Sequence, residues 1–172
     1  TYVVAERDLN NTFKQQTLNE LEKKANLLVT SVGSLNRFDD IYAADLFANE
    51  LGNASNSRVT FIKNDGQVIG DSELDFDEIT IIDNHGNRSE VIDALKNGAG
   101  WSSRYSSTLN QDLLYFAIQD NEDVYPNIIR ISVPITYIDN ITDTLGLSVL
   151  LLFVVVFIVS AIASGVSANY LY

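Results

Sequence analysis

Residues 58–69 read RVTFIKNDGQVI. Two runs rich in β-branched and aromatic residues, 58–62 and 67–69, flank the turn-forming Asn64, Asp65 and Gly66. This composition, with a short Asn/Asp/Gly turn between the runs, predicts an antiparallel β-hairpin. The stretch therefore places a β-sheet in the middle of the chain, and the segments on either side complete the fold.

Three further strands are expected after this hairpin, over 101–107, 112–119 and 128–135. Short helices are expected at 40–51, with Gly52 as the C-terminal stop, and at 89–96, closed by Asn97 and Gly98. The segment between Gly70 and Arg88 is expected to be a loop. Because the strands form an antiparallel set with the helices on one side, the order of elements predicts an α+β domain with a five-stranded antiparallel sheet.

The first 36 residues predict one long helix, since they contain no proline and no glycine before Gly33. Apolar residues recur along it with the spacing of a heptad seam: Leu18, Leu21, Ala25, Leu28, Val32 and Leu35. A helix of this length is roughly 50 Å long, which exceeds the diameter of about 38 Å expected for the domain. We therefore expect residues 1–36 to form a stalk that pairs in a homodimer through this seam or a neighbouring face. The alternative is an amphipathic helix lying on the sheet, and both can hold if Leu21 to Leu35 pack on the domain while the first turns stand clear of it.

The C-terminal segment is uncharged, because all 34 charged residues lie in the first 144 positions. Residues 145–166 read LGLSVLLLFVVVFIVSAIASGV, which predicts a transmembrane helix of roughly 33 Å. The alternative is a fully buried core helix. Arg130 is the only basic residue among the twenty that precede Leu145. Since positive charge collects on the cytoplasmic side, residues 1–144 should be extracytoplasmic.

The domain boundaries follow from this orientation. We expect the folded domain at 37–137, an exit helix at 138–144 and the start of a cytoplasmic linker at 167–172. The chain begins at Thr1 and contains no Met, so we expect it to be a fragment of a longer protein.

The composition excludes several functions. The net charge of −12 argues against nucleic-acid binding, which needs a basic surface. The absence of cysteine excludes a thiolate metal site and a cysteine nucleophile. The sequence contains no G-x-S-x-G elbow, H-E-x-x-H helix or phosphate-binding glycine loop. We expect neither a catalytic site nor a cofactor in this chain.

Three segments resemble a known family. RVTFIKNDGQVIGDS (58–72), NHGNRSEVIDALKNG (84–98) and WSSRYSSTLNQDLLYFAI (101–118) are similar, in the same order, to extracytoplasmic PAS-like (single Cache) sensor domains of PhoR-like bacterial histidine kinases. Ser89 replaces a usual proline, and Lys63 replaces a common acidic residue.

This resemblance implies a signal-sensing domain that relays a stimulus through a transmembrane helix to a cytoplasmic kinase. The kinase, its ATP and Mg²⁺, and a response regulator that it would phosphorylate belong to parts of the protein beyond this chain. The alternatives are a chemoreceptor, a cyclic-dinucleotide enzyme or a membrane-tethered interaction module that uses the same domain.

Two groups of side chains are candidate sites. The resemblance implies a small-ligand pocket between the sheet and the short helix, and the candidates are His85, Arg88, Arg104, Tyr105 and Tyr115. Arginine binds carboxylate or phosphate with forked donors, and histidine adds sensitivity to pH near neutrality. The alternative is that these residues only support the fold, with Arg88 and Arg104 in internal ion pairs.

The second group consists of the alternating acids Asp71, Glu73, Asp75 and Asp77. Such oxygens can collect around Ca²⁺. A calcium-binding EF-hand is excluded, because Phe76 occupies the glycine position and Ile82 the twelfth position. The alternative is a solvated acidic loop.

Overall fold

The computed structural model describes residues 2–33, 38, 40–120, 126–135 and 149–160. The chain divides into two units, Thr1–Ile135 and Thr136–Tyr172. The first unit contains these elements: α1 (Tyr2–Gly33), α2 (Ile41–Ser55), β1 (Arg58–Ile62), β2 (Val68–Asp71), α3 (Phe76–Ile79), α4 (Ser89–Asn97), β3 (Ala99–Ser106), β4 (Gln111–Gln119) and β5 (Ile128–Pro134).

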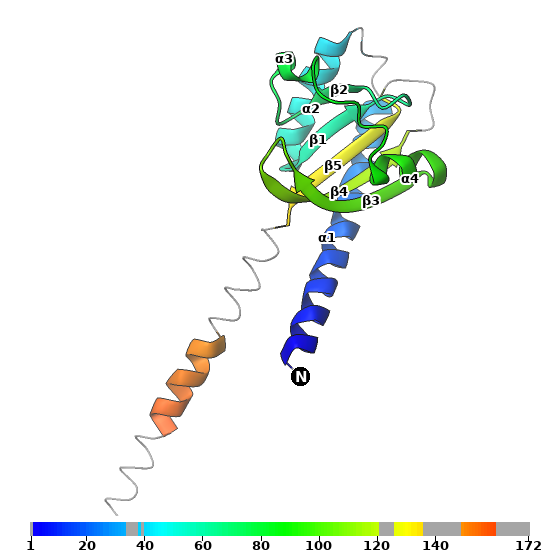
Figure 1. Cartoon of the computed structure of the whole chain (residues 1–172). Coiled ribbons are helices and arrows are strands. Elements are labelled where there is room, and N and C mark those ends of the chain that lie inside the picture. The colour runs from blue at the N-terminus through cyan, green and yellow to red at the C-terminus, as the bar shows by residue number, and fades with distance from the viewer. Residues whose placement is uncertain (1, 34–37, 39, 121–125, 136–148, 161–172) are drawn as a thin grey trace, which may run out of the picture. The chain divides into compact units, whose positions relative to one another are not determined.

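The five strands form one antiparallel sheet in the order β2-β1-β5-β4-β3, so the last strand in sequence lies in the middle (Figure 1). The predicted hairpin is confirmed by the pairing of Thr60 with Asp71 and of Phe61 with Gly70. Gly66 in its turn has φ +85°, which an L side chain rarely adopts. The predicted α+β class, with an N-terminal helix and a five-stranded antiparallel sheet, is confirmed.

Helices α1 and α2 cover one face of the sheet. The described seam residues of α1 are at most 7% exposed, and they belong to a core cluster with Leu114, Phe116, Ile129 and Ile131. These seam residues are Leu18, Leu21, Ala25, Leu28 and Val32, while Leu35 lies outside the described residues. The seam is therefore core within one chain and is not available to a second copy. Figure 1 shows the N-terminal part of α1 extending beyond the sheet.

Helix α2 ends later than expected. Its N-cap is Asp40, whose carboxylate accepts a hydrogen bond from the backbone N of Ala43 at 2.8 Å. The helix then passes through Gly52 and ends at Ser55, with Asn56 as its C-cap in the left-handed conformation at φ 48°. The prediction of Gly52 as a C-terminal stop is wrong. A Cβ at Gly52 would collide with the side chain of Ser72, so glycine is needed here for close packing.

Helices α3 and α4 lie on the other face, where Val91 and Ala94 of α4 pack with Ile128 and Ala117. The expectation of helices on only one side of the sheet is therefore wrong, because each face of the sheet is apolar enough to be covered. Helix α4 closes at Gly98, as predicted, with φ +86°. The expected loop after Gly70 differs in two respects. Asp71 is the last residue of β2, and Phe76–Ile79 forms the short helix α3.

In the second unit, residues 149–160 are helical and their side chains are exposed. Within the described ranges, no helix has both the length and the apolar character needed to span a membrane. The expected exit helix at 138–144 and the linker at 167–172 lie outside the described residues, as do both ends of the expected transmembrane segment.

Candidate functional site

A cluster of buried charges lies between α4 and the sheet. Glu90, on α4, is 0% exposed. Its carboxylate accepts hydrogen bonds from Arg104 Nη1 and from Ser102 Oγ, both at 2.6 Å, and from Arg130 Nη1 at 3.3 Å. Arg104 and Ser102 belong to β3 and Arg130 to β5. One carboxylate therefore ties a helix to two strands.

A second ion pair extends this cluster across the sheet. Arg58 Nε, on β1, donates to the two carboxylate oxygens of Asp71 at 2.8 and 3.1 Å. Thr60 Oγ1 donates to Asp71 at 2.7 Å and accepts from Arg130 Nη2 at 3.2 Å. The Tyr115 ring, on β4, lies 3.9 Å from the Arg104 guanidinium carbon and 5.1 Å from that of Arg130. The network therefore contains side chains from all five strands and from α4.

The charges of this network perturb one another. Burial alone would raise the pKa of Glu90, but the hydrogen bonds from Arg104 and Ser102 and the charge of Arg130 outweigh it. The pKa of Glu90 consequently lies below its usual value, and Glu90 is an anion at neutral pH. Burial lowers the pKa of the Arg130 guanidinium, against the attraction of Asp71 and Glu90.

His85 lies beside this network and is 6% exposed. Burial, followed by the charges of Arg130, Arg88, Arg58 and Arg104, lowers the pKa of His85 to about 3. Its imidazole is therefore neutral at physiological pH, and the expected sensitivity to pH near neutrality is wrong. Four guanidinium groups thus act on one neutral histidine.

Four of the five ligand-site candidates from the sequence lie close to one another in the structure. His85, Arg88, Arg104 and Tyr115 gather around the buried network. Tyr105 does not join them, because it is 58% exposed and its hydroxyl donates to Asn110 Oδ1 at 3.3 Å. Arg104 is held in an internal ion pair, but its partner is Glu90 of α4 and not an acid across the sheet.

Sequence reasoning did not single out Arg58, Glu90 and Arg130. Two of them are charged residues inside otherwise apolar strands, RVTFI and IIRISVP. A charge at such a position must find a partner or shift its pKa, and that signal could have identified them.

Several buried polar atoms of this region have no hydrogen-bond partner in the part of the chain that the structure describes. They are His85 Nδ1, Arg88 Nε, Arg130 Nε and Ser132 Oγ. Buried polar atoms normally have a partner, so such a group of them marks a place where water or a ligand completes the bonding.

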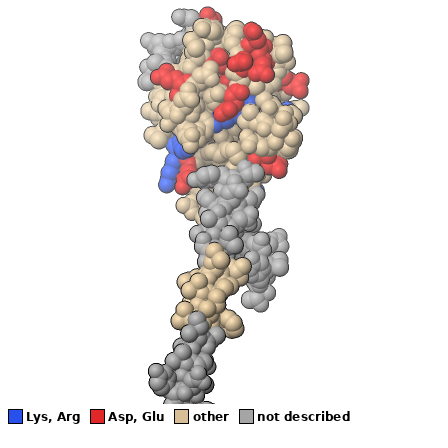
Figure 2. Space-filling view, turned by 90° about the vertical axis from the view of Figure 1, so that its left-hand side faces the viewer, with Lys and Arg blue, Asp and Glu red and all other residues tan. Residues whose placement is uncertain are grey.

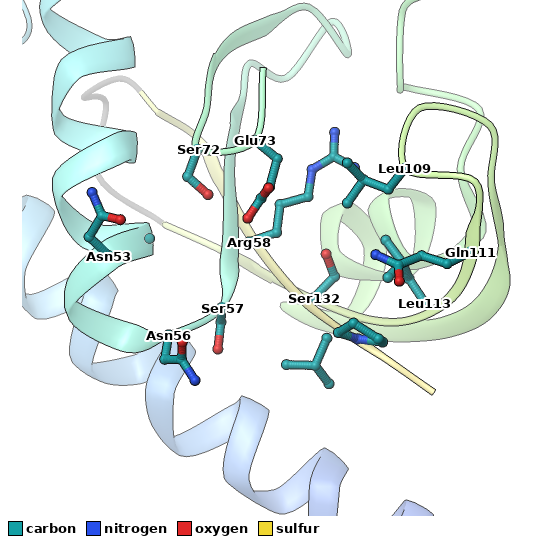
Figure 3. Close-up of a pocket in the computed structure, with 13 residues that line it drawn as sticks. Asn53, Asn56, Ser57, Arg58, Ser72, Glu73, Leu109, Gln111, Leu113 and Ser132 are labelled. Carbon is teal, nitrogen blue, oxygen red and sulfur yellow. The ribbon is translucent and has the colours of Figure 1, made fainter. Parts of the chain in front are cut away.

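A pocket of about 300 Å³ borders this region (Figure 3). Its walls come from the C-terminal end of α2, the start of β1, the residues after β2, the β3–β4 turn and the end of β5. Its polar lining consists of Asn53, Asn56, Ser57, Arg58, Ser72, Glu73, Gln111 and Ser132. Leu109, Leu113, Val133 and Pro134 form the apolar part. The expected ligand residues do not line this pocket, and only Arg58 and Ser132 connect it to the unpartnered region.

The alternating acids are divided between different roles. Asp71 is 0% exposed and paired with Arg58, whereas Glu73, Asp75 and Asp77 are exposed. Across the described ranges, no group of three or more His, Asp or Glu residues is placed to hold a metal ion. Asp71 is thus committed to the fold, and Ca²⁺ binding by the other three stays a prediction.

The surface contrasts with this interior. Figure 2 shows acidic side chains spread over the visible face of the domain, while basic atoms appear mainly in a recess between them and at one edge. Two arginines of the network, Arg58 and Arg130, are buried within the domain.

No family model matches the chain. No curated protein matches it either. Among solved structures, the chain is similar to the sensor domain of the histidine kinase DctB of V. cholerae, with 14% identity and a TM-score of 0.46. The match covers 76% of this chain and 49% of the other, so the chain spans about half the length of that sensor domain.

Proposed function

We propose that this chain is the extracytoplasmic sensing part of a bacterial membrane sensor histidine kinase. The observation that carries the proposal is the buried network in which Glu90 joins α4 to Arg104 and Arg130 of the sheet. The motifs at 58–118 that resemble PAS-like sensors of PhoR-like kinases contain most of this network. The uncharged segment 145–166 supports a membrane anchor.

The network suits a signalling role better than a purely stabilising one. Buried ion pairs contribute little net stability, because the cost of removing both charges from water offsets their attraction. They do respond to any nearby change of charge, since the interior screens charges weakly. A stimulus near His85, Arg88 or Arg104 would change the balance of charges around Glu90, and with it the packing of α4 on the sheet.

The route to the kinase follows the chain. Arg130 lies on β5, the last strand before the uncharged segment. A shift of α4 that alters the Arg130–Glu90 pair therefore acts on the strand that leads toward the proposed transmembrane helix. The kinase, with its ATP and Mg²⁺, its response regulator and the homodimer in which it would work, belongs to the same proposal.

The test uses the full-length membrane protein in lipid vesicles, with autophosphorylation as the readout. Glu90→Gln keeps the shape of the side chain and removes its charge, and we expect the basal activity to change at least about threefold. Asp93→Asn is the matched control, because Asp93 is exposed on the same helix, and it should behave like the wild type. Ser102→Ala removes a single hydrogen bond to Glu90 and should shift the activity in the same direction.

Two outcomes would contradict the proposal. One is a folded Ser102→Ala or Glu90→Gln protein with unchanged activity. The other is a sequence after Tyr172 without a kinase. A long coiled-coil hairpin there would indicate a chemoreceptor, a cyclic-dinucleotide catalytic domain would indicate that enzyme, and a short basic tail would indicate an interaction module.

A further inference from the structure

We infer that the pocket bordered by Arg58, Ser132 and Glu73 binds a small zwitterion of the amino-acid type. This inference rests on the proposed sensing function and names the class of its ligand. It concerns a different set of residues from the candidates around His85.

The first observation is an unused pair of donors at the pocket wall. Arg58 is 5% exposed and pairs with Asp71 through Nε alone, so its two terminal nitrogens have no hydrogen-bond partner in the described part of the chain. Ser132 is 2% exposed and its Oγ is also unpartnered there. Figure 3 shows the Ser132 hydroxyl pointing toward the space between Arg58 and Leu109. A guanidinium edge beside a hydroxyl matches a carboxylate.

The second observation is the negative charge on the same pocket. Glu73 lines it, is exposed, and forms no ion pair within the described ranges. In Figure 3 the Glu73 side chain extends from the segment after β2 toward the middle of the pocket. Asp71, directly behind Arg58, already balances the guanidinium charge.

Together these charges select the ligand class. The pocket is lined by one cation, Arg58, and one anion, Glu73, and the buried Asp71 adds a second negative charge through its ion pair with Arg58. A dianion such as phosphate would be repelled by the excess negative charge, while a simple amine would leave the Arg58 donors and the Ser132 hydroxyl unused. A zwitterion satisfies both ends, because its carboxylate meets Arg58 and Ser132 and its ammonium faces Glu73.

The size and walls of the pocket agree with a small polar ligand. The volume of about 300 Å³ lies at the lower end of the range for small-molecule sites. Leu109, Leu113 and Val133 provide an apolar wall for a short side chain. The amides of Asn53 and Gln111 provide further hydrogen-bonding groups at its edge.

The pocket is connected to the network proposed to carry the signal. Arg58 contacts Asp71, Asp71 accepts from Thr60, and Thr60 accepts from Arg130, which also binds Glu90. A carboxylate bound to Arg58 competes with Asp71 for its charge. Ligand occupancy in the pocket therefore reaches Glu90 through three shared side chains.

Isothermal titration calorimetry on the whole chain in detergent micelles tests the inference. The probes are glycine and L-alanine as zwitterions, with propionate and ethylammonium as matched molecules that carry only one of the two charges. We expect both zwitterions to bind at least about tenfold more tightly than either single-charge probe.

Variants assign the binding to this pocket. Glu73→Gln should weaken zwitterion binding at least about tenfold, whereas Asp77→Asn, an exposed acid outside the pocket, should not. Ser132→Ala should weaken binding several-fold without lowering the melting temperature, because its hydroxyl has no partner to lose.

The inference is overturned if neither zwitterion binds, if propionate binds as well as L-alanine, or if Glu73→Gln matches Asp77→Asn. This failure is distinguishable from failure of the proposed function. If neither zwitterion binds but Glu90→Gln still changes the autophosphorylation, only the inference about the pocket is contradicted. If the zwitterions bind but Glu90→Gln leaves the autophosphorylation unchanged, only the proposed sensing function is contradicted.

Discussion

At the scale of residues, the domain is organised around the charge of Glu90. A carboxylate without exposure is expensive to keep ionised unless it is paired and hydrogen-bonded. Three donors from two strands satisfy this carboxylate. Because each donor comes from a different place in the sheet, the pairing holds only when α4 is seated correctly. The hydrogen bonding of Glu90 therefore depends on the position of α4.

His85 gives the domain a predictable sensitivity to acid. Its pKa is about 3 in the folded chain and about 6.5 when unfolded, so the unfolded chain takes up a proton first as the pH falls. We expect the free energy of unfolding to decrease by up to about 2 kcal/mol from about pH 7 to about pH 5. Urea unfolding at several pH values measures this slope.

His85→Gln is the matched variant, because it removes the only histidine of the chain. Its free energy of unfolding should be nearly constant over the same range. A slope equal to that of the wild type would show that other groups cause the acid sensitivity. At lower pH, protonation of Glu90, whose pKa is also lowered in the fold, should reduce the stability of both proteins further.

At the scale of elements, most of the local structure is predictable from short-range patterns. The hairpin at Gly66, the cap at Gly98 and the strands of the sheet depend on neighbours in sequence, and the structure has them close to the expected positions. Gly52 was mispredicted because two physical reasons for glycine look alike in sequence. It serves close packing against Ser72, which lies 20 residues further on.

The candidate site is less predictable, because its contacts, like that of Gly52 with Ser72, join residues far apart in the sequence. Glu90 is 14 residues from Arg104 and 40 from Arg130 in the sequence, and Arg130 is 70 from Thr60. No local pattern specifies which of the charges in the chain will meet. The choice is made by the strand order, which places β5 between β1 and β4.

Gly52→Ala tests the packing explanation. In an exposed helix this change would stabilise by about 1 kcal/mol, through helix propensity. Here we expect a net loss of stability of about 1–2 kcal/mol, because the added methyl collides with Ser72. Thermal or urea unfolding measures the difference.

Two further variants complete that test. Gly52→Ala combined with Ser72→Gly should recover part of the loss, since it removes the obstructing side chain. Glu50→Ala, at an exposed position of the same helix, should not destabilise. A stabilised Gly52→Ala protein would mean that the contact with Ser72 relaxes at little cost.

At the scale of the whole molecule, the proposed homodimer would have to use a different face of α1 from the predicted seam, because the seam is buried within one chain. Leu28 is 6% exposed within one chain, while its neighbour Leu27 is 69% exposed. An exposed leucine on a long helix is available to a second copy, and a buried one is not.

Cysteine variants separate these two faces without background, because the chain has no cysteine. We expect Leu27→Cys to react rapidly with a thiol reagent and, if the proposed homodimer forms in detergent micelles, to give a disulfide-linked dimer of this chain under mild oxidation. Leu28→Cys should react slowly and form little dimer. Efficient crosslinking of Leu28→Cys in a folded protein would show that the predicted seam is the dimer contact after all.

The central place of β5 also determines the order in which the domain can fold. Before residues 128–134 have been synthesised, β1 with β2 and β3 with β4 are two separate hairpins with no strand between them. The ion pairs of Arg130 and the packing of Ile129 and Ile131 under α1 form only when that last strand inserts. Contacts over such sequence distances slow folding. A ribosome must therefore release almost the whole domain before its sheet can close, and a chain truncated ahead of β5 is left with two unpaired edges that can aggregate.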